Sequence, residues 1–355
     1  MEPMDKIIEW FGENTLERRH QRVRDFWAGR ERYIVSVQST EAAYRQKQDE
    51  EEMLDLAVEN LRAQADLPGC NLPAFFADFG PVSTARYWGG TVRYDEESEN
   101  IYIEPHVGSV DEALKLDRRP VDDPEMDAAR AIRLFRELSG RLNTDQLWLR
   151  MPDIQGPLNT AGLVVNQTQM LMDAHSEPDK MREFLDEITT FLIEYVSFCA
   201  EATGGQLCGF IWPYTFFPVE FGVSLTEDLM PLLSPDMYRD FGLPCLQRLA
   251  DEFGGLHIHC CGDWGRHAPT LGDSGLPVRA VEFHHPFTTI EELEPLAPDT
   301  VFVPYLALDQ QDEFDGLCEF YDHLLENTPD AYRYWFALPE DSDEALDFAR
   351  RHGFG

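Results

Sequence analysis

The sequence predicts a single α/β barrel of the (β/α)8 TIM type, with a helical extension at its N-terminus and a β-hairpin inserted after the second strand. Short runs of apolar, β-branched or aromatic residues recur along the 355 residues, and each is followed by a longer segment of helical period. Eight such runs can be counted, and eight βα units close a barrel rather than forming an open sheet. Because no interdomain linker interrupts this rhythm, we expect one domain over residues 1–355.

Each predicted strand is short and ends in polar residues or in Gly or Pro. The eight are Tyr33 to Gln38, Leu72 to Asp78, Leu147 to Pro152, Leu207 to Trp212, Leu256 to Cys261, Val278 to His284, Val301 to Leu306 and Tyr332 to Leu338. The intervening helices are predicted at Glu51 to Gln64, Met126 to Leu142, Glu177 to Thr203, Pro235 to Phe253, Thr289 to Leu296, Glu313 to Glu326 and Ser342 to His352.

Two segments depart from the βα repeat. Residues Met1 to Arg32 are predicted to form helices that pack outside the barrel. Between Gly80 and Leu116, the runs Thr91 to Tyr94 and Ile101 to Glu104 flank an acidic turn, which predicts the hairpin.

The composition excludes several classes of partner. With 66 acidic and 29 basic residues the formal net charge is -37, so nucleic acid and anionic membranes would be repelled. Only Lys6, Lys47, Lys115 and Lys180 are lysines, and this excess of carboxylates suggests adaptation to high salt. We expect a cytoplasmic protein, because no segment resembles a signal peptide or an apolar membrane span.

The seven cysteines point to a reducing compartment. Their number is odd, and adjacent Cys260 and Cys261 make an unlikely disulfide framework, so reduced thiols or metal ligation are favoured.

The fifth predicted strand ends in residues that can carry chemistry. Alternation along a strand places His257, His259 and Cys261 on one face, which we expect to line the barrel mouth. Imidazole and thiolate are strong zinc ligands, so His259 and Cys261 form half of a metal site, with His257 as an acid or base. In the alternative interpretation these residues are hydrogen-bonded histidines and apolar fillers of the core.

Neighbouring strands offer further candidates. Glu282 and His284 share one face of the sixth strand and could complete the metal site or act as acid and base. Other polar or aromatic residues that follow predicted strands could bind or activate a substrate, namely Gln38, Asp78, Asp153, Asn159, Trp212, Tyr214 and Glu220.

Three segments resemble the superfamily of uroporphyrinogen decarboxylase and the corrinoid-linked methyltransferases. These are the Gly-Pro turn in Ile154 to Leu158, the Ser-Pro helix start in Leu233 to Pro244, and His259-Cys260-Cys261-Gly262, which matches a His-x-Cys-Gly strand end. The resemblance is firm from about Leu147 to the end of the chain and loose before it.

The resemblance implies a role for each motif. The methyltransferases of this superfamily hold zinc with the His and Cys of the motif and a later Cys on the last strand, which implies His259 and Cys261 as ligands. The last predicted strand here, Tyr332 to Leu338, contains no cysteine, so Glu220, Glu282 or His284 could supply the remaining ligand. The decarboxylase uses an Asp near the end of strand two, where this chain has Asp78, but it also uses arginines in the loop after strand one, where this chain has no arginine before Arg45.

Three hypotheses follow. The first is a zinc-dependent methyltransferase or demethylase that moves a methyl group between a small methylated compound, a corrinoid and an acceptor; the corrinoid is free or carried by a partner protein. In it Glu282, His257 or Tyr214 handles protons. The second is a cofactor-free decarboxylase that uses Asp78, and the third is a non-catalytic barrel that binds a corrinoid or porphyrin. The resemblance also makes a homodimer a possible assembly.

Overall fold

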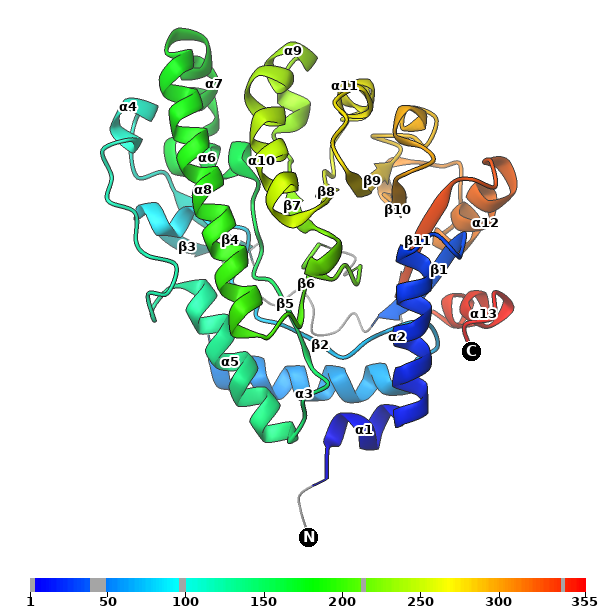
Figure 1. The fold of residues 1–355 in the computed structure, drawn as a ribbon. Helices are drawn as coiled ribbons and strands as arrows, with labels where there is room; N and C mark the ends of the chain where they lie inside the picture. Colours follow the sequence, from blue (N-terminus) through cyan, green and yellow to red (C-terminus); the bar gives the residue numbers. More distant parts are fainter. Residues whose placement is uncertain (1–3, 39–48, 96–99, 212–214, 340–341) are drawn as a thin grey trace.

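The computed structural model describes residues 4–38, 49–95, 100–211, 215–339 and 342–355. The chain has an α/β fold in which parallel strands are covered on the outside by helices (Figure 1). The six-stranded sheet has the order β1-β11-β10-β9-β8-β7, and the three-stranded sheet has the order β2-β5-β6. This architecture is consistent with a TIM barrel.

The strands of the two parallel sheets are short, and most of their residues are buried. They are β1 (Tyr33–Gln38), β2 (Ala74–Phe76), β5 (Trp148–Arg150), β6 (Leu207–Cys208), β7 (Val223–Thr226), β8 (Leu256–His259), β9 (Val278–His285), β10 (Val301–Leu306) and β11 (Arg333–Pro339). Antiparallel β3 (Thr91–Asp95) and β4 (Asn100–Glu104) pair where the sequence predicts a hairpin.

The helices of the structure are α1 (Lys6–Phe11), α2 (Glu13–Trp27), α3 (Glu50–Asp66), α4 (Val110–Ala113), α5 (Asp127–Leu142), α6 (Pro157–Val165), α7 (Gln167–Ser176), α8 (Pro178–Ala202), α9 (Pro235–Met237), α10 (Leu243–Phe253), α11 (Ala268–Asp273), α12 (Leu317–Asn327) and α13 (Asp343–Arg351). Every helix predicted between strands but one overlaps a helix of the structure, which also has α4, α6, α7 and α11 where none was predicted. The prediction of a helix over Thr289 to Leu296 is wrong, since only a 3₁₀ turn forms there, at Glu294–Leu296. Pro295 and Pro298 limit this segment, because proline supplies no backbone N–H for helical hydrogen bonds.

Apolar stripes explain why these helices pack on the sheets. In α8, Phe184, Ile188 and Phe191 recur at helical spacing and are all buried, and Pro178 occupies the first turn, where its missing N–H costs nothing. Such a stripe needs an apolar partner surface, so α8 turns these side chains into the hydrophobic core.

The fourth predicted strand is only partly confirmed. Of its described residues, Leu207 to Ile211, only the two of β6 lie in a strand, and they pair parallel with β5. Beyond β6, Gly209 N donates to Phe217 O over 2.8 Å. The strand that continues the sheet toward β8 is β7, which the sequence did not predict; Ser224 lies opposite His257, and Thr226 lies opposite His259. This additional strand changes which residues reach the barrel mouth.

The closed barrel that the sequence predicts is not formed as a continuous ladder. Between β5 and β7 the sheets are joined by hydrogen bonds of Ile154 and Gly156 with Thr226. At the other edge, in the described part of the chain, no ladder pairs β1 with β2; instead Cys70 N donates to Val35 O over 2.9 Å. Gly69, at φ +102°, permits this close approach, because a Cβ there would lie 2.9 Å from Val35 O.

Aromatic side chains pack together at the amino-terminal end of the strands. Trp27 of α2 stacks on Trp335 of β11 with ring centroids 5.8 Å apart and meets Phe217 edge-on at 4.9 Å. The opposite, carboxyl ends of the strands carry the polar side chains and therefore form the candidate site. Within the described ranges, no helix has both the length and the apolar character needed to cross a membrane.

Candidate metal centre

The carboxyl ends of three adjacent strands bring five polar residues together. Asp228 follows β7, His259 ends β8 and Cys261 follows it, while Glu282 and His284 lie on β9. Parallel pairing of β7, β8 and β9 aligns these ends at one edge of the sheet, so residues far apart in sequence become neighbours. Two groups that could hold a metal ion result, and they share His259.

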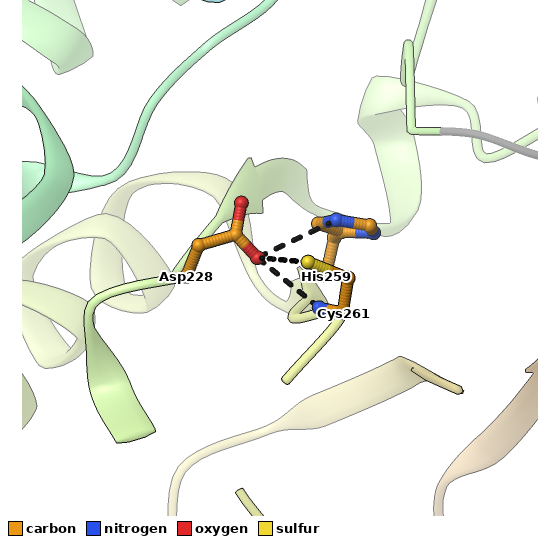
Figure 2. A group of neighbouring side chains, drawn as sticks. All are labelled: Asp228, His259 and Cys261. Atoms are coloured by element: carbon orange, nitrogen blue, oxygen red, sulfur yellow. Dashed lines mark hydrogen bonds and ion pairs between the residues drawn. The ribbon is translucent and has the colours of Figure 1, made fainter. Parts of the chain in front are cut away.

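The first group is Asp228, His259 and Cys261, which Figure 2 shows converging on one carboxylate oxygen. Asp228 Oδ1 lies 3.6 Å from His259 Nε2 and 3.4 Å from Cys261 Sγ, and it also accepts a hydrogen bond of 3.1 Å from Cys261 N. Zinc bonds of 2.0–2.3 Å in tetrahedral geometry place ligand atoms about 3.3–3.6 Å apart. Nitrogen, sulfur and oxygen donors at these separations fit a zinc ion that keeps one coordination position for a substrate.

The second group is His259, Glu282 and His284, and its spacing is that of hydrogen bonds. Glu282 Oε2 accepts from His259 Nδ1, and Glu282 Oε1 lies 2.8 Å from His284 Nε2. These atoms are closer than zinc ligands stand to one another. The geometry therefore favours Glu282 as the residue that orients His259 and leaves Nε2 free for a metal, a common arrangement around metal-bound histidines.

Charge couples these residues strongly. Burial lowers the pKa of His259, but the negative charge of Glu282, together with hydrogen bonds to Cys261 and Glu282, outweighs burial and raises that pKa well above its usual value. Burial raises the pKa of fully buried Glu282, but the neighbouring His259 and His284 hold it below its usual range. Without a metal, His259 and Glu282 thus form a buried ion pair.

His257 lies one layer deeper in the barrel. Its side chain is fully buried, its Nδ1 lies 3.2 Å from Ser224 Oγ, and its ring contacts Phe217. Burial lowers the pKa of His257 to about 3, although Glu282 opposes this shift, so the ring is neutral. It belongs to neither metal-binding group.

Two more carboxyl groups lie at the mouth. Asp78 follows β2 and accepts a hydrogen bond of 2.8 Å from Gly80 N, and burial raises its pKa to about 6. Asp153 follows β5; burial, and then the charge of Asp78, raises its pKa to about 7. The charges of Asp228 and His259 also act on Asp153, so the two carboxyl groups belong to the same electrostatic environment as the metal-binding group.

The structure places the remaining candidates less favourably. Asn159 Oδ1 accepts from Leu229 N and its Nδ2 donates to Gln155, so both ends of its amide are engaged within the protein. Gln38 is buried at the end of β1 and donates to Ser36 Oγ over 3.5 Å. Trp212 and Tyr214 lie outside the described residues.

The expectation that Glu220 ligates the metal does not fit the structure. Glu220 is exposed in the 3₁₀ turn at Val219–Phe221, which precedes β7 and so lies at the amino-terminal end of that strand. The expectation placed Glu220 after the fourth strand, but a further strand, β7, begins at Val223, and Glu220 precedes it. The acid that reaches the mouth from this strand is Asp228.

Sequence reasoning missed Asp228 and its neighbour Glu227. Glu227 is buried with neither carboxylate oxygen hydrogen-bonded in the described part of the chain, and burial, and then the charge of Asp228, raises its pKa to about 8. Its carboxyl group lies against the Cα of Gly156, where a Cβ would clash with it, which explains the glycine of the Gly-Pro turn. The signal that could have revealed both acids is the alternating segment Val223-Ser224-Leu225, which is followed by Thr-Glu-Asp.

Comparisons with known proteins agree with this architecture. The family model described as uroporphyrinogen decarboxylase (URO-D) matches residues 76–298. A methylated-thiol–coenzyme M methyltransferase of Methanosarcina mazei is 28% identical over 127 residues, and the match covers 36% of this chain but only 31% of the relative. A solved structure of a methyltransferase from Methanosarcina mazei superposes with a TM-score of 0.66 at 14% identity and covers 95% of this chain and 99% of its own. The chain belongs to the uroporphyrinogen decarboxylase family.

Proposed function

We propose that this chain is a zinc-dependent methyltransferase that moves a methyl group between a small methylated compound, a corrinoid and an acceptor. The observation that carries the proposal is the convergence of His259 Nε2, Cys261 Sγ and Asp228 Oδ1 at the spacing of a zinc ligand set. Asp228 would take the place of the last-strand cysteine that the related methyltransferases use. The name of the relative from Methanosarcina mazei supports a methyl-transfer reaction, although that match spans less than a third of the relative.

His259, Cys261 and Asp228 would hold the zinc ion. When bound, zinc acts as a Lewis acid and favours the deprotonated form of a thiol or another acceptor heteroatom. Glu282 would keep the proton of His259 on Nδ1, so that Nε2 presents its lone pair at the site.

The methyl transfer itself requires a deprotonated acceptor. The corrinoid would supply the methyl group: the acceptor sulfur would bond to the methyl carbon as that carbon leaves the corrinoid, which would retain the bonding electron pair. The proton of the acceptor must leave first, and coordination of the acceptor thiol by zinc would favour its loss to water. His257 and Glu282 are not suited to take this proton directly, since His257 is enclosed and neutral and Glu282 is engaged by two imidazoles.

A second candidate function is decarboxylation of a porphyrinogen without a cofactor. The match of residues 76–298 to the uroporphyrinogen decarboxylase model favours it, as does the carboxyl group of Asp78 at the end of β2. Against it stands the charge of the mouth, where Asp78, Asp153 and Asp228 would repel a substrate with several carboxylates.

The test is methyl transfer from methylcobalamin to small thiols, followed by the visible spectrum of the corrinoid and by mass spectrometry of the thioether. We expect turnover by the zinc-loaded protein, loss of turnover after chelation, recovery on adding zinc, and no turnover by Cys261→Ser. Turnover that survives both chelation and Cys261→Ser would contradict the proposal. Consumption of a porphyrinogen by the chelated protein would establish the second candidate instead.

A further inference from the structure

A hydrogen-bonded series of three side chains connects the loop after β5 with the loop after β7. Gln155 Nε2 donates to Asp153 Oδ1 over 2.6 Å, and Asn159 Nδ2 donates to Gln155 Oε1 over 2.8 Å. Asn159 Oδ1 accepts from Leu229 N over 3.0 Å. Gln155 and Asn159 are each only 5% exposed, so water cannot replace these bonds easily.

This series of hydrogen bonds can run in only one direction from donor to acceptor. A backbone N–H can only donate, so Leu229 fixes the carbonyl end of the Asn159 amide toward itself. The NH2 end of Asn159 must then face Gln155, which turns the Gln155 carbonyl toward Asn159 and its NH2 toward Asp153. The backbone of Gln155 is held as well, because Thr160 Oγ1 donates to its carbonyl over 2.9 Å.

We propose that Gln155 and Asn159 are positioning residues that hold Asp153 by its Oδ1 so that Oδ2 faces the barrel mouth and accepts a hydrogen bond from the substrate. Among the described residues, none donates a hydrogen bond to Asp153 Oδ2, and the side chain is partly exposed. A carboxyl oxygen in a largely desolvated place is satisfied when a ligand supplies the missing donor.

The charges around Asp153 define the class of ligand. Asp78 faces it from the end of β2, Asp228 from the end of β7 and His259 from β8. Three carboxyl groups and one imidazole disfavour an anionic acceptor and favour one that carries an O–H or an ammonium group. The inference deepens the proposed function, and it predicts that the acceptor is a thiol with a neutral or cationic hydrogen-bond donor.

The first experiment compares two thiols of similar size, cysteamine with its ammonium group and ethanethiol with no donor beyond S–H. We expect Asp153→Ala to lower kcat/KM for cysteamine by about 10- to 100-fold and to leave that for ethanethiol within about twofold, as removal of a hydrogen bond to a charged group would. An equal loss for both thiols, or no loss for cysteamine, would overturn the assignment of Asp153 Oδ2 to the ligand.

The second experiment tests the donor-to-acceptor direction of these hydrogen bonds. Asn159→Asp keeps an acceptor for Leu229 N but cannot donate to Gln155, so Gln155 turns its carbonyl toward Asp153 and disfavours the ionised carboxylate. We expect the pH midpoint of kcat/KM for cysteamine to rise by about one unit. The matched control is Asn166→Asp, the same change at the exposed cap of α7, where the side chain accepts from Thr168 N. A midpoint that moves equally in both variants, or in neither, would contradict the inference.

A third measurement needs no turnover. Because burial raises the pKa of Asp153 above its unfolded value, its contribution to stability is lost as the pH rises from about 4 to about 7. Gln155→Met removes the donor without adding a charge, so we expect this loss to extend about one unit higher, and to be abolished in the Asp153→Asn background. If Gln155→Met leaves the pH dependence of thermal unfolding unchanged, the positioning role is wrong. If the wild type methylates no thiol, the proposed function fails, while this measurement still decides on the positioning role.

Discussion

Replacing Glu282 by Gln tests whether this residue orients the metal-binding histidine. Glu282 is fully buried and its two oxygens contact His259 Nδ1 and His284 Nε2. A glutamine of the same shape can accept from only one imidazole and carries no charge, so His259 would lose its strongest orienting partner. Loss of such a partner typically weakens metal binding about 10- to 100-fold, which corresponds to about 1.4–2.8 kcal/mol.

The assay is a competition titration of zinc against a chromophoric chelator at neutral pH. Glu220→Gln is the matched control, because it is the same substitution at an exposed site on the opposite end of β7. We expect Glu282→Gln to raise the zinc Kd within the stated range and Glu220→Gln to leave it unchanged. Wild-type affinity in Glu282→Gln, or a comparable loss in Glu220→Gln, would refute the reasoning.

Three further predictions follow from the same structure. Asp228→Asn, which removes a ligand rather than its partner, should weaken zinc binding more than Glu282→Gln does in the same titration; an unchanged Kd would exclude Asp228 from the ligand set. Glu227→Gln should flatten the pH dependence of the free energy of unfolding. Burial raises the pKa of Glu227 to about 8, so its contribution of a few kcal/mol is lost as the pH rises from about 4.5 to 8. Chemical denaturation across this pH range checks it, and parallel curves for the variant and the wild type would contradict it. The net charge of -37 predicts that the Tm rises by several degrees with added KCl, because salt screens the repulsion between surface carboxylates; scanning calorimetry that finds a flat or falling Tm would count against adaptation to salt.

Much of the fold could be predicted because the βα repeat is encoded locally. The predicted bounds of β1 and β10 match the structure, since runs such as Tyr33 to Gln38 have clear polar or glycine boundaries. Strand β7 could not be predicted from local sequence, because Leu207 to Trp212 is the more apolar run. Only tertiary hydrogen bonds select Val223–Thr226 as the partner of β8. At the edge between β1 and β2, where the described residues form no ladder, the contact of Gly69 and Cys70 with β1 is likewise not evident from any local pattern.

The same limit explains the candidate site. Strand alternation placed His259 and Cys261 together, because Cys261 comes two residues after His259, just beyond the end of β8. Asp228 was missed and Glu220 was chosen instead, because β7 was not predicted. Glu220 precedes β7 and lies at its amino-terminal end, whereas Asp228 follows β7 and lies at its carboxyl end. Asn159 was taken as a substrate contact because sequence does not reveal that Leu229 N and Gln155 occupy both ends of its amide.

The most direct test of the central claim is elemental analysis of the protein purified without added metal or chelator, together with His259→Ala, Cys261→Ser and Asp228→Asn. The account predicts close to one zinc per chain in the wild type and a large loss in each of the three variants. Wild-type protein free of zinc, or full zinc occupancy in Asp228→Asn, would contradict it.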